Sequence, residues 1–308
     1  MCPSLPIFTP TDIKRQQTLP TGFLWVDYLL EGKGLNRGCL YELIGPPAVG
    51  KSSFALQLAG QIQRYGGVVV YVDADGSFSP SYARRLGVQT DALFVLHPDH
   101  INQLVEMLHS LHKTLVPDLI ILDSLPALSG QLESEQTAHP DGTLRYYDDL
   151  DRLLRYLTGL AELHDSVVVA VNQYRQVQDE EGEWTEVPAC RRLHQSANII
   201  LRFAFKPNSF AADEGGIEIS IHEGYTDTIP KRMRAILDPT FGISPYAEAF
   251  LLGVYLRLVQ FRENGFCYHA ICMGETFEAA LAYLRRAPQH FYALRQEIWK
   301  GLPKKIRQ

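Results

Sequence analysis

Cysteine and basic residues are both in short supply in this sequence. The five cysteines are odd in number and scattered along 308 residues, which argues against a disulfide framework and indicates a reducing, intracellular compartment. Lysine and arginine, 29 together, are outnumbered by 35 acidic residues, which leaves a net charge of -6. Such a chain does not bind nucleic acid through a globally basic surface, although this net charge still allows a local basic patch.

Long hydrophobic runs, internal repeats and low-complexity tracts are also missing. The first eleven residues contain three prolines and no apolar stretch of signal-peptide length. The most apolar late stretch, residues 247–259, is too short to cross a bilayer and contains Glu248 and Arg257. We therefore expect no membrane partner.

One short stretch carries the strongest signal in the sequence. Residues 45–52 read GPPAVGKS and match the phosphate-binding pattern G-x-x-x-x-G-K-[ST] at every fixed position. A strand-like run, 38–44, precedes this stretch, and a run with helical apolar spacing, 54–62, follows it. In such a loop the backbone amides and the helix N-terminus bind phosphate oxygens, while Lys51 neutralises the outer phosphates and Ser52 binds Mg2+.

The rest of the chain predicts an α/β fold. Apolar strands are predicted at 38–44, 68–73, 92–96, 117–124 and 167–173, with helices between them. This alternation is typical of a mostly parallel sheet with helices on both faces. Residues 174–195 read as a polar loop, and antiparallel strands at 198–205, 217–221 and 231–237 extend the sheet. Helices at 247–263, 275–285 and 289–299 follow.

We divide the chain accordingly. Residues 1–17 are expected to be a flexible lead-in, 18–245 a phosphate-loop core, and 246–308 a C-terminal helical extension with a basic tail. The aromatic residues of the first late helix, among them Phe250, Tyr255 and Phe261, are expected either in the core or covering an exposed face. Cys267, His269 and Cys272 suggest a metal only faintly, because an apolar strand over 266–273 accounts for them better.

Polar residues follow three of the predicted strands. Asp75, Asp123 and Gln173 lie at carboxyl ends of strands, where open parallel sheets bind ligands. Asp123 ends an apolar strand and suits a carboxylate that holds Mg2+ directly or through water. Asp75 is placed to orient or deprotonate an attacking water, but Asp73 and Asp75 can equally just shape a turn at Gly76.

The order of these motifs resembles the ATPase core of RecA-type recombinases. Residues 19–205 contain, in this order, the motifs GPPAVGKSS, YVDADGSF, LIILDSLPAL and VVVAVNQ. Within the family, these motifs are most similar to those of the eukaryotic and archaeal branch and its non-filament paralogs. The resemblance implies Mg2+ on Ser52 and Asp123, a water-activating acid at Asp75 and a γ-phosphate sensor at Gln173. Tyr82 stands near the position where the family often stacks a basic residue on adenine, and its ring can stack instead. The implied ATP-binding residues are Gly45, Pro46, Pro47, Ala48, Val49, Gly50, Lys51, Ser52, Ser53 and Tyr82, and Lys51, Asp75 and Gln173 are the implied catalytic residues.

Several features depart from the family pattern. The family usually has Glu where this chain has Asp75, which is one methylene shorter, so we expect slow or negligible hydrolysis. The N-terminal helical domain of the recombinases is missing, and residues 8–11 lack the alanine of the family's self-assembly segment, so autonomous filaments are not expected. The family's two DNA-binding loops correspond to residues 129–144 and 174–195, which are acidic here and predict weak binding of single-stranded DNA.

These features favour one function over two alternatives. The resemblance implies an ATP-binding paralog that acts as an assembly or mediator subunit in homologous recombination and double-strand break repair, with another RecA-type paralog and a strand-exchange recombinase as partners, in the nucleus if the source is eukaryotic. The alternative is an active DNA-dependent ATPase or strand-exchange motor. A phosphate-loop kinase of a small molecule is less favoured, because we find no arginine-rich lid after the core.

Overall fold

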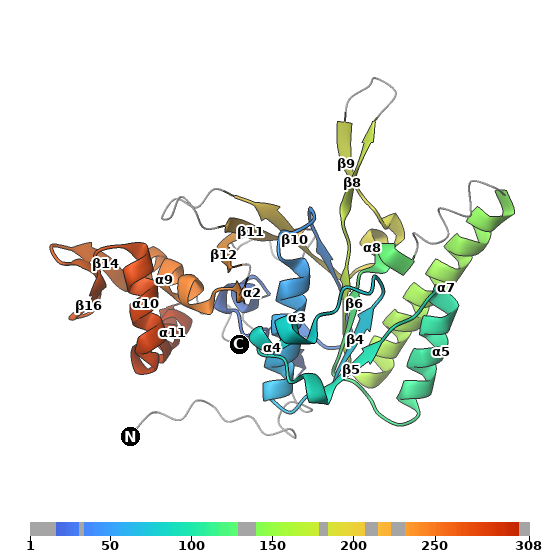
Figure 1. The fold of residues 1–308 in the computed structure, drawn as a ribbon, viewed down its shortest axis with the longest axis horizontal. Helices are drawn as coiled ribbons and strands as arrows, with labels where there is room; N and C mark the ends of the chain where they lie inside the picture. Colours follow the sequence, from blue (N-terminus) through green and yellow to red (C-terminus); the bar gives the residue numbers. More distant parts are fainter. Residues whose placement is uncertain are drawn as a thin grey trace.

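The structure, a computed structural model, describes residues 17–30, 34–128, 140–178, 184–206, 215–222, 232–238 and 240–301. Its centre is a nine-stranded sheet in the order β13-β12-β11-β10-β3-β7-β6-β4-β5 (Figure 1). The strands from β10 to β5 in this order run parallel, and β11, β12 and β13 run antiparallel. The strands are β3 (Leu40–Ile44), β4 (Val69–Asp73), β5 (Leu93–Leu96), β6 (Leu119–Asp123), β7 (Val167–Val171), β10 (Ile199–Phe205), β11 (Gly215–His222), β12 (Arg232–Asp238) and β13 (Gly242–Ile243). The predicted fold class is confirmed.

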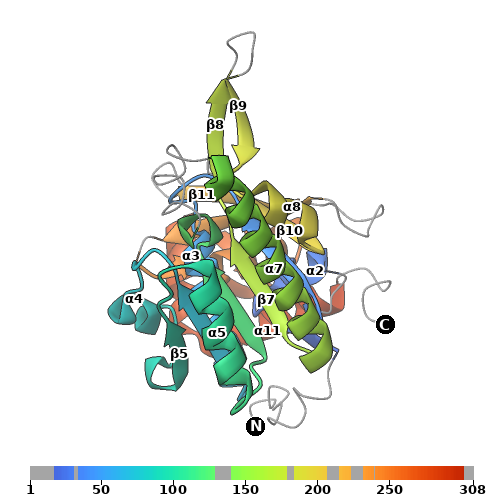
Figure 2. The same cartoon turned by 90° about the vertical axis from the view of Figure 1, so that its right-hand side faces the viewer.

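Helices cover both faces of this sheet. The helix α3 (Lys51–Arg64) packs on one face, while α5 (Ile101–His112) and α7 (Pro140–His164) lie side by side over the other (Figure 2). The strands alternate accordingly: Tyr41 and Leu43 belong to the core under α3, and Leu40 belongs to the core under α5 and α7. Burial on both faces explains why the parallel strands are almost continuously apolar.

Short elements connect this frame. The strands β1 (Thr18–Leu19) and β2 (Leu35–Asn36) pair with each other, and the short helix α2 (Leu24–Leu29) lies between them in the sequence. After β4 come α4 (Pro80–Arg85) and the 3-10 turn η1 (Thr90–Ala92), which lead the chain to the edge strand β5. In the described part of the chain, no helix is both long and apolar enough to cross a membrane.

The polar loop predicted for residues 174–195 is wrong. The structure places a hairpin there, β8 (Tyr174–Gln178) with β9 (Trp184–Pro188), followed by the helix α8 (Arg191–Ser196). Figure 1 shows the hairpin projecting away from the central sheet. Its charged residues suggested a loop, but an isolated hairpin leaves both faces in water, so its strands need no apolar alternation.

The helix predicted for residues 247–263 is correct only in its first half. The helix α9 (Pro245–Tyr255) ends before Arg257, which has a φ of 59°. A small antiparallel sheet follows, β14 (Val259–Arg262), β15 (Gly265–Tyr268) and β16 (Ile271–Gly274), and a turn at His269, with a φ of 53°, divides the single strand predicted for 266–273. Left-handed backbone at non-glycine residues is uncommon and leaves no reliable sequence signal.

The late helices α10 (Phe277–Arg286) and α11 (Pro288–Gly301) confirm the two predicted there. Phe250 lies in the core, whereas Tyr255 and Phe261 are exposed. Cys267 and Cys272 oppose each other on β15 and β16, and no group of three metal-ligating side chains occurs among the described residues. Most of the basic tail falls outside those residues, as does most of the N-terminal lead-in.

A buried acidic pair joins the C-terminal helices to the N-terminal α2. Glu248 of α9 accepts a hydrogen bond from the Trp25 backbone at 2.9 Å, and its other oxygen lies 3.5 Å from Arg295. Asp27 accepts two hydrogen bonds from Thr21. Burial raises the pKa of Asp27 to about 6 and that of Glu248 to about 7. Burial therefore shifts both carboxyl groups toward the protonated form.

We expect Glu248 to make the stability of the fold depend on pH. Its folded-state pKa lies above the usual 4.5, so its stabilising contribution is complete below that pH and is lost as the pH rises through about 7. Urea unfolding at pH 5.5 and pH 8 should show that wild type gains about 2 kcal/mol over Glu248→Gln at the lower pH. The difference in stability between wild type and Glu278→Gln, a change at an exposed position, should be the same at both pH values. An equal difference between wild type and Glu248→Gln at both pH values would contradict this prediction.

Candidate functional site

The loop after β3 depends on glycine at two positions. Gly50 precedes α3 with a φ of 92°, and a Cβ atom there would lie 2.8 Å from the Leu237 side chain of β12. A Cβ atom on Gly45 would lie 2.4 Å from the Phe203 carbonyl oxygen. Glycine has no Cβ atom, so at these two positions the loop can pack closely against β10 and β12. The predicted phosphate loop therefore has the strand, loop and helix context that its motif requires.

Lys51 is folded back onto this loop. Its Nζ atom donates hydrogen bonds to the Gly45 and Pro46 carbonyl oxygens at 2.9 Å and 2.7 Å. Burial lowers the pKa of Lys51 to about 8, and the nearby Asp123 carboxylate counteracts part of that effect. A buried cation whose hydrogen bonds go to carbonyl oxygens gains strongly from an anion placed beside it.

Asp123 lies at the end of β6, buried and close to the first turn of α3. The Tyr71 hydroxyl donates a hydrogen bond to its Oδ2 atom at 2.6 Å. Burial raises the pKa of Asp123, while hydrogen bonds from Tyr71 and Ser52 lower it. The Ser52 hydroxyl and the Asp123 carboxylate are oxygen donors of the kind that Mg2+ prefers, and the structure brings them within hydrogen-bonding reach of each other. These two residues would suit a magnesium ion, which would supply charge neutralisation to a bound phosphate.

The two acids at the end of β4 and just after it differ in their surroundings. Asp73 is buried and accepts hydrogen bonds from the Ser77 and Phe78 backbones at 3.0 Å and 3.1 Å, so it shapes the turn. Asp75 is exposed and accepts only a longer bond from the Ser77 backbone, at 3.2 Å. Its charge still contributes to raising the pKa values of Asp123 and Tyr71. Asp73 thus fits the turn-shaping alternative, and Asp75 lies within electrostatic range of Asp123.

Tyr82 lies on α4 beside the start of α3. Its hydroxyl is 2.7 Å from the Ser53 hydroxyl, and the Arg85 guanidinium lies 5.4 Å from the centre of its ring. The structure therefore places the residue predicted to meet the base next to the phosphate loop.

Gln173 and Asn172 follow β7 but differ in their surroundings. Gln173 is half buried and comes after Val169 and Val171, which pack on the α3 side of the sheet. Asn172 is fully buried and bonds to Glu42 on β3 and to the Cys190 backbone. Asn172 therefore helps to hold the frame of the fold together, whereas Gln173 lies at the carboxyl end of β7.

A polar network that the sequence did not predict surrounds Asn172. Glu42 is fully buried on β3, and its Oε2 atom lies 2.6 Å from His194 Nδ1 on α8. Burial raises the pKa of Glu42, while hydrogen bonds from Asn172 and His194 lower it. The one signal in the sequence is a glutamate inside an apolar strand, LYELI.

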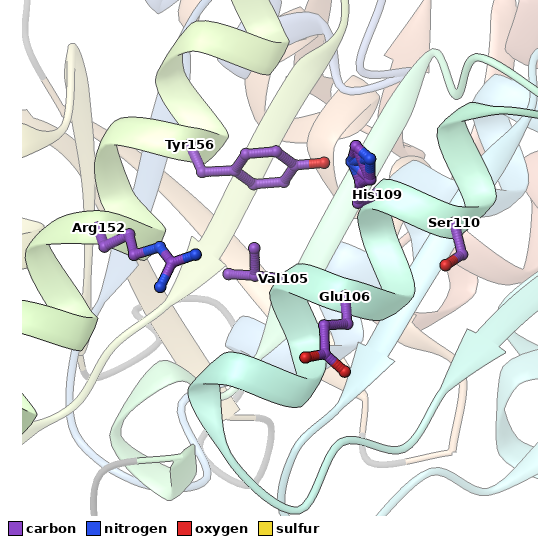
Figure 3. Close-up of a pocket in the computed structure, with 6 residues that line it drawn as sticks. All are labelled: Val105, Glu106, His109, Ser110, Arg152 and Tyr156. Carbon is purple, nitrogen blue, oxygen red and sulfur yellow. The ribbon is translucent and has the colours of Figure 1, made fainter.

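A separate groove lies between α5 and α7, on the sheet face opposite α3 (Figure 3). In Figure 3 the Tyr156 ring points toward His109, and Arg152 extends from α7 toward α5. The groove is lined by Val105, Glu106, His109, Ser110, Arg152 and Tyr156. No predicted site residue contributes to it.

The geometry and the sheet together define a class of protein. The site combines a phosphate loop that contains a buried lysine, a carboxylate at a strand end beside the loop serine, and a second acid near the end of the neighbouring strand. Together these are the parts of a phosphate-loop nucleotide-binding α/β protein.

Comparison with known proteins narrows the class. The RecA N-terminal domain family matches residues 8–181, more than half of the chain, so the chain belongs to the RecA family. It is 28% identical over 294 residues to Protein RecA of Thermus thermophilus, an alignment that covers 93% of this chain and 86% of that protein. It is 26% identical over 303 residues to Protein RecA of Campylobacter lari, covering 96% and 86%. Alignments of this extent include most of residues 206–308, so the late part of the chain aligns with these RecA proteins as well.

Proposed function

We propose that this chain is an ATP-binding RecA-family protein that acts as an assembly or mediator subunit in homologous recombination and double-strand break repair. The observation that carries the proposal is the convergence of Lys51, Ser52 and Asp123 beside a shortened acid, Asp75. The first three residues suit tight binding of a metal-bound triphosphate, and the fourth suits slow hydrolysis. ATP then serves to order the strand-end segments for a partner.

Each predicted site residue has a place in this proposal. The amides of residues 45–53 hold the phosphates, Lys51 neutralises them, and Tyr82 meets the base. Ser52 and Asp123 hold Mg2+, which supplies charge neutralisation at the phosphates. Asp75 orients the attacking water, and Gln173 senses the γ-phosphate. We retain residues 18–245 as the core and 246–308 as the C-terminal extension.

The partners follow from charge and from the family. Phosphate contacts dominate affinity for nucleic acid, and the segment around the hairpin is acidic overall, so direct binding of single-stranded DNA should be weak. On α8, Arg192 is already paired with Asp151 at 2.7 Å. The proposed partners are therefore proteins: another RecA-type paralog and a strand-exchange recombinase. The relatives reported above are bacterial, so they give the expected nuclear location and eukaryotic subtype no support.

Phosphate release with and without single-stranded DNA tests this function. We expect wild type to bind ATP in the presence of Mg2+ and to release phosphate slowly, with no stimulation by DNA. Asp75→Glu restores the missing methylene and should raise the rate about tenfold, a modest share of what a well-placed acid or base supplies. Asp91→Glu, an exposed acid in η1, serves as the matched control and should leave the rate unchanged.

Two results would contradict the proposal. Strong stimulation of wild type by DNA would favour the strand-exchange motor, which is the second candidate because the chain aligns with RecA over most of its length. Transfer of phosphate to a small acceptor would favour a kinase. If Asp75→Glu hydrolyses ATP no faster than wild type, the length of the acid does not limit the rate.

A further inference from the structure

Tyr71 is a buried tyrosine whose hydroxyl donates a hydrogen bond to a predicted metal ligand. It lies on β4, which pairs with β6 so that Tyr71 opposes Ile121, two residues before Asp123. Side chains two residues apart on a strand share a face, so Tyr71 and Asp123 both lie on the α3 side of the sheet. The Tyr71 hydroxyl reaches Asp123 Oδ2 at 2.6 Å, and the residue is 2% exposed.

The same side chain supports the turn that carries Asp75. The centre of the Tyr71 ring is 5.2 Å from that of Phe78, and the Phe78 backbone donates a hydrogen bond to Asp73. A phenylalanine at position 71 would make the same ring contact. The hydroxyl adds something that the ring does not. Burying a hydroxyl without a hydrogen-bond partner is costly, and the Tyr71 hydroxyl bonds to Asp123.

We propose that Tyr71 is a positioning residue for Mg2+. Its single hydroxyl proton occupies Asp123 Oδ2, which leaves Oδ1 as the oxygen that would face the metal. Without that bond the carboxylate rotates about its last torsion, which is broad in aspartate, and offers the metal a mixture of orientations. Tyr71 thus determines how well the site binds the metal, and the inference rests on the nucleotide site proposed above.

The effect should appear in the dependence on Mg2+. A residue that hydrogen-bonds to a metal ligand typically contributes a factor of about 10–100 to the affinity of the site for the metal. For Tyr71→Phe we expect the Mg2+ concentration that gives half-maximal binding of a non-hydrolysable ATP analogue to rise about tenfold or more. Binding of the nucleotide in EDTA should stay within about twofold of wild type, because the phosphate loop and Lys51 are unchanged.

A second tyrosine supplies the matched control. Tyr268 is also buried and donates its phenolic hydrogen bond to a carboxylate, Glu297, but it lies on β15 in the C-terminal extension. Tyr268→Phe should leave both the Mg2+ titration and the EDTA measurement unchanged. Circular dichroism spectra and unfolding midpoints of both variants show whether either has lost its fold.

The outcomes separate this inference from the proposed function. If wild type shows metal-dependent nucleotide binding and Tyr71→Phe matches it, the positioning role is overturned and the function stands. If Tyr71→Phe weakens binding equally in EDTA and in Mg2+, the hydroxyl supports the whole site and a specific role toward the metal is again overturned. If wild type binds no nucleotide at any Mg2+ concentration, both the function and the inference fall.

Discussion

Replacing Lys51 with methionine should weaken ATP binding by about a hundredfold or more. The Lys51 ammonium group lies at the phosphate loop with two hydrogen bonds, and hydrogen bonds that involve a charged group contribute about 1.5–3 kcal/mol each. Losing two of them to phosphate oxygens corresponds to at least about 3 kcal/mol, or about two decades in Kd. Methionine keeps an unbranched apolar side chain in the buried space, so the fold should survive.

Fluorescence titration with a labelled ATP analogue measures this effect. Lys113→Met, at an exposed position at the end of α5, removes one positive charge from the same protein and should leave the affinity within about twofold, because solvent screens exposed charges. If Lys51→Met binds as tightly as wild type, the nucleotide does not use this loop, and every role assigned from it falls with it.

The phosphate loop was predictable because its parts are consecutive. Residues 45–52 supply the glycines, the lysine and the serine, and the strand and helix on either side are read from local apolar spacing. Asp123 and Asp75 needed one further step, since parallel strands bring their carboxyl ends to one edge. The structure brings Asp123 within hydrogen-bonding reach of Ser52, and it separates the turn-shaping Asp73 from the exposed Asp75.

Other features were not predictable because they depend on distant partners. Glu42 and His194 are 152 residues apart, and nothing in the sequence around either residue indicates the other. The hairpin β8–β9 and the sheet β14–β16 are exposed, polar or very short, so the alternation that marks a buried strand is weak in them. Tyr71 belongs to the same group: its place in a strand is clear from VVVYVD, but its hydrogen bond needs β6 as the neighbour.

Replacing Asn172 with alanine should cost about 4 kcal/mol in the free energy of unfolding. The Asn172 amide donates to Glu42 Oε1 at 2.5 Å and to the Cys190 carbonyl at 3.0 Å, and its oxygen accepts from the Gln173 and Cys190 backbones at 2.9 Å and 3.1 Å. Alanine leaves these groups without that partner, and each buried unsatisfied group costs about 1–3 kcal/mol. Urea unfolding gives the difference directly.

Asn102 on α5 provides the matched control. Its amide donates a single exposed hydrogen bond to Asp149 at 3.1 Å, so Asn102→Ala should change stability by less than about 0.5 kcal/mol. Equal unfolding midpoints for the two variants would show that water reaches the Glu42 network and replaces Asn172. A large loss confined to Asn172→Ala would mean that β3, which leads into the phosphate loop, is joined to α8 by buried polar contacts.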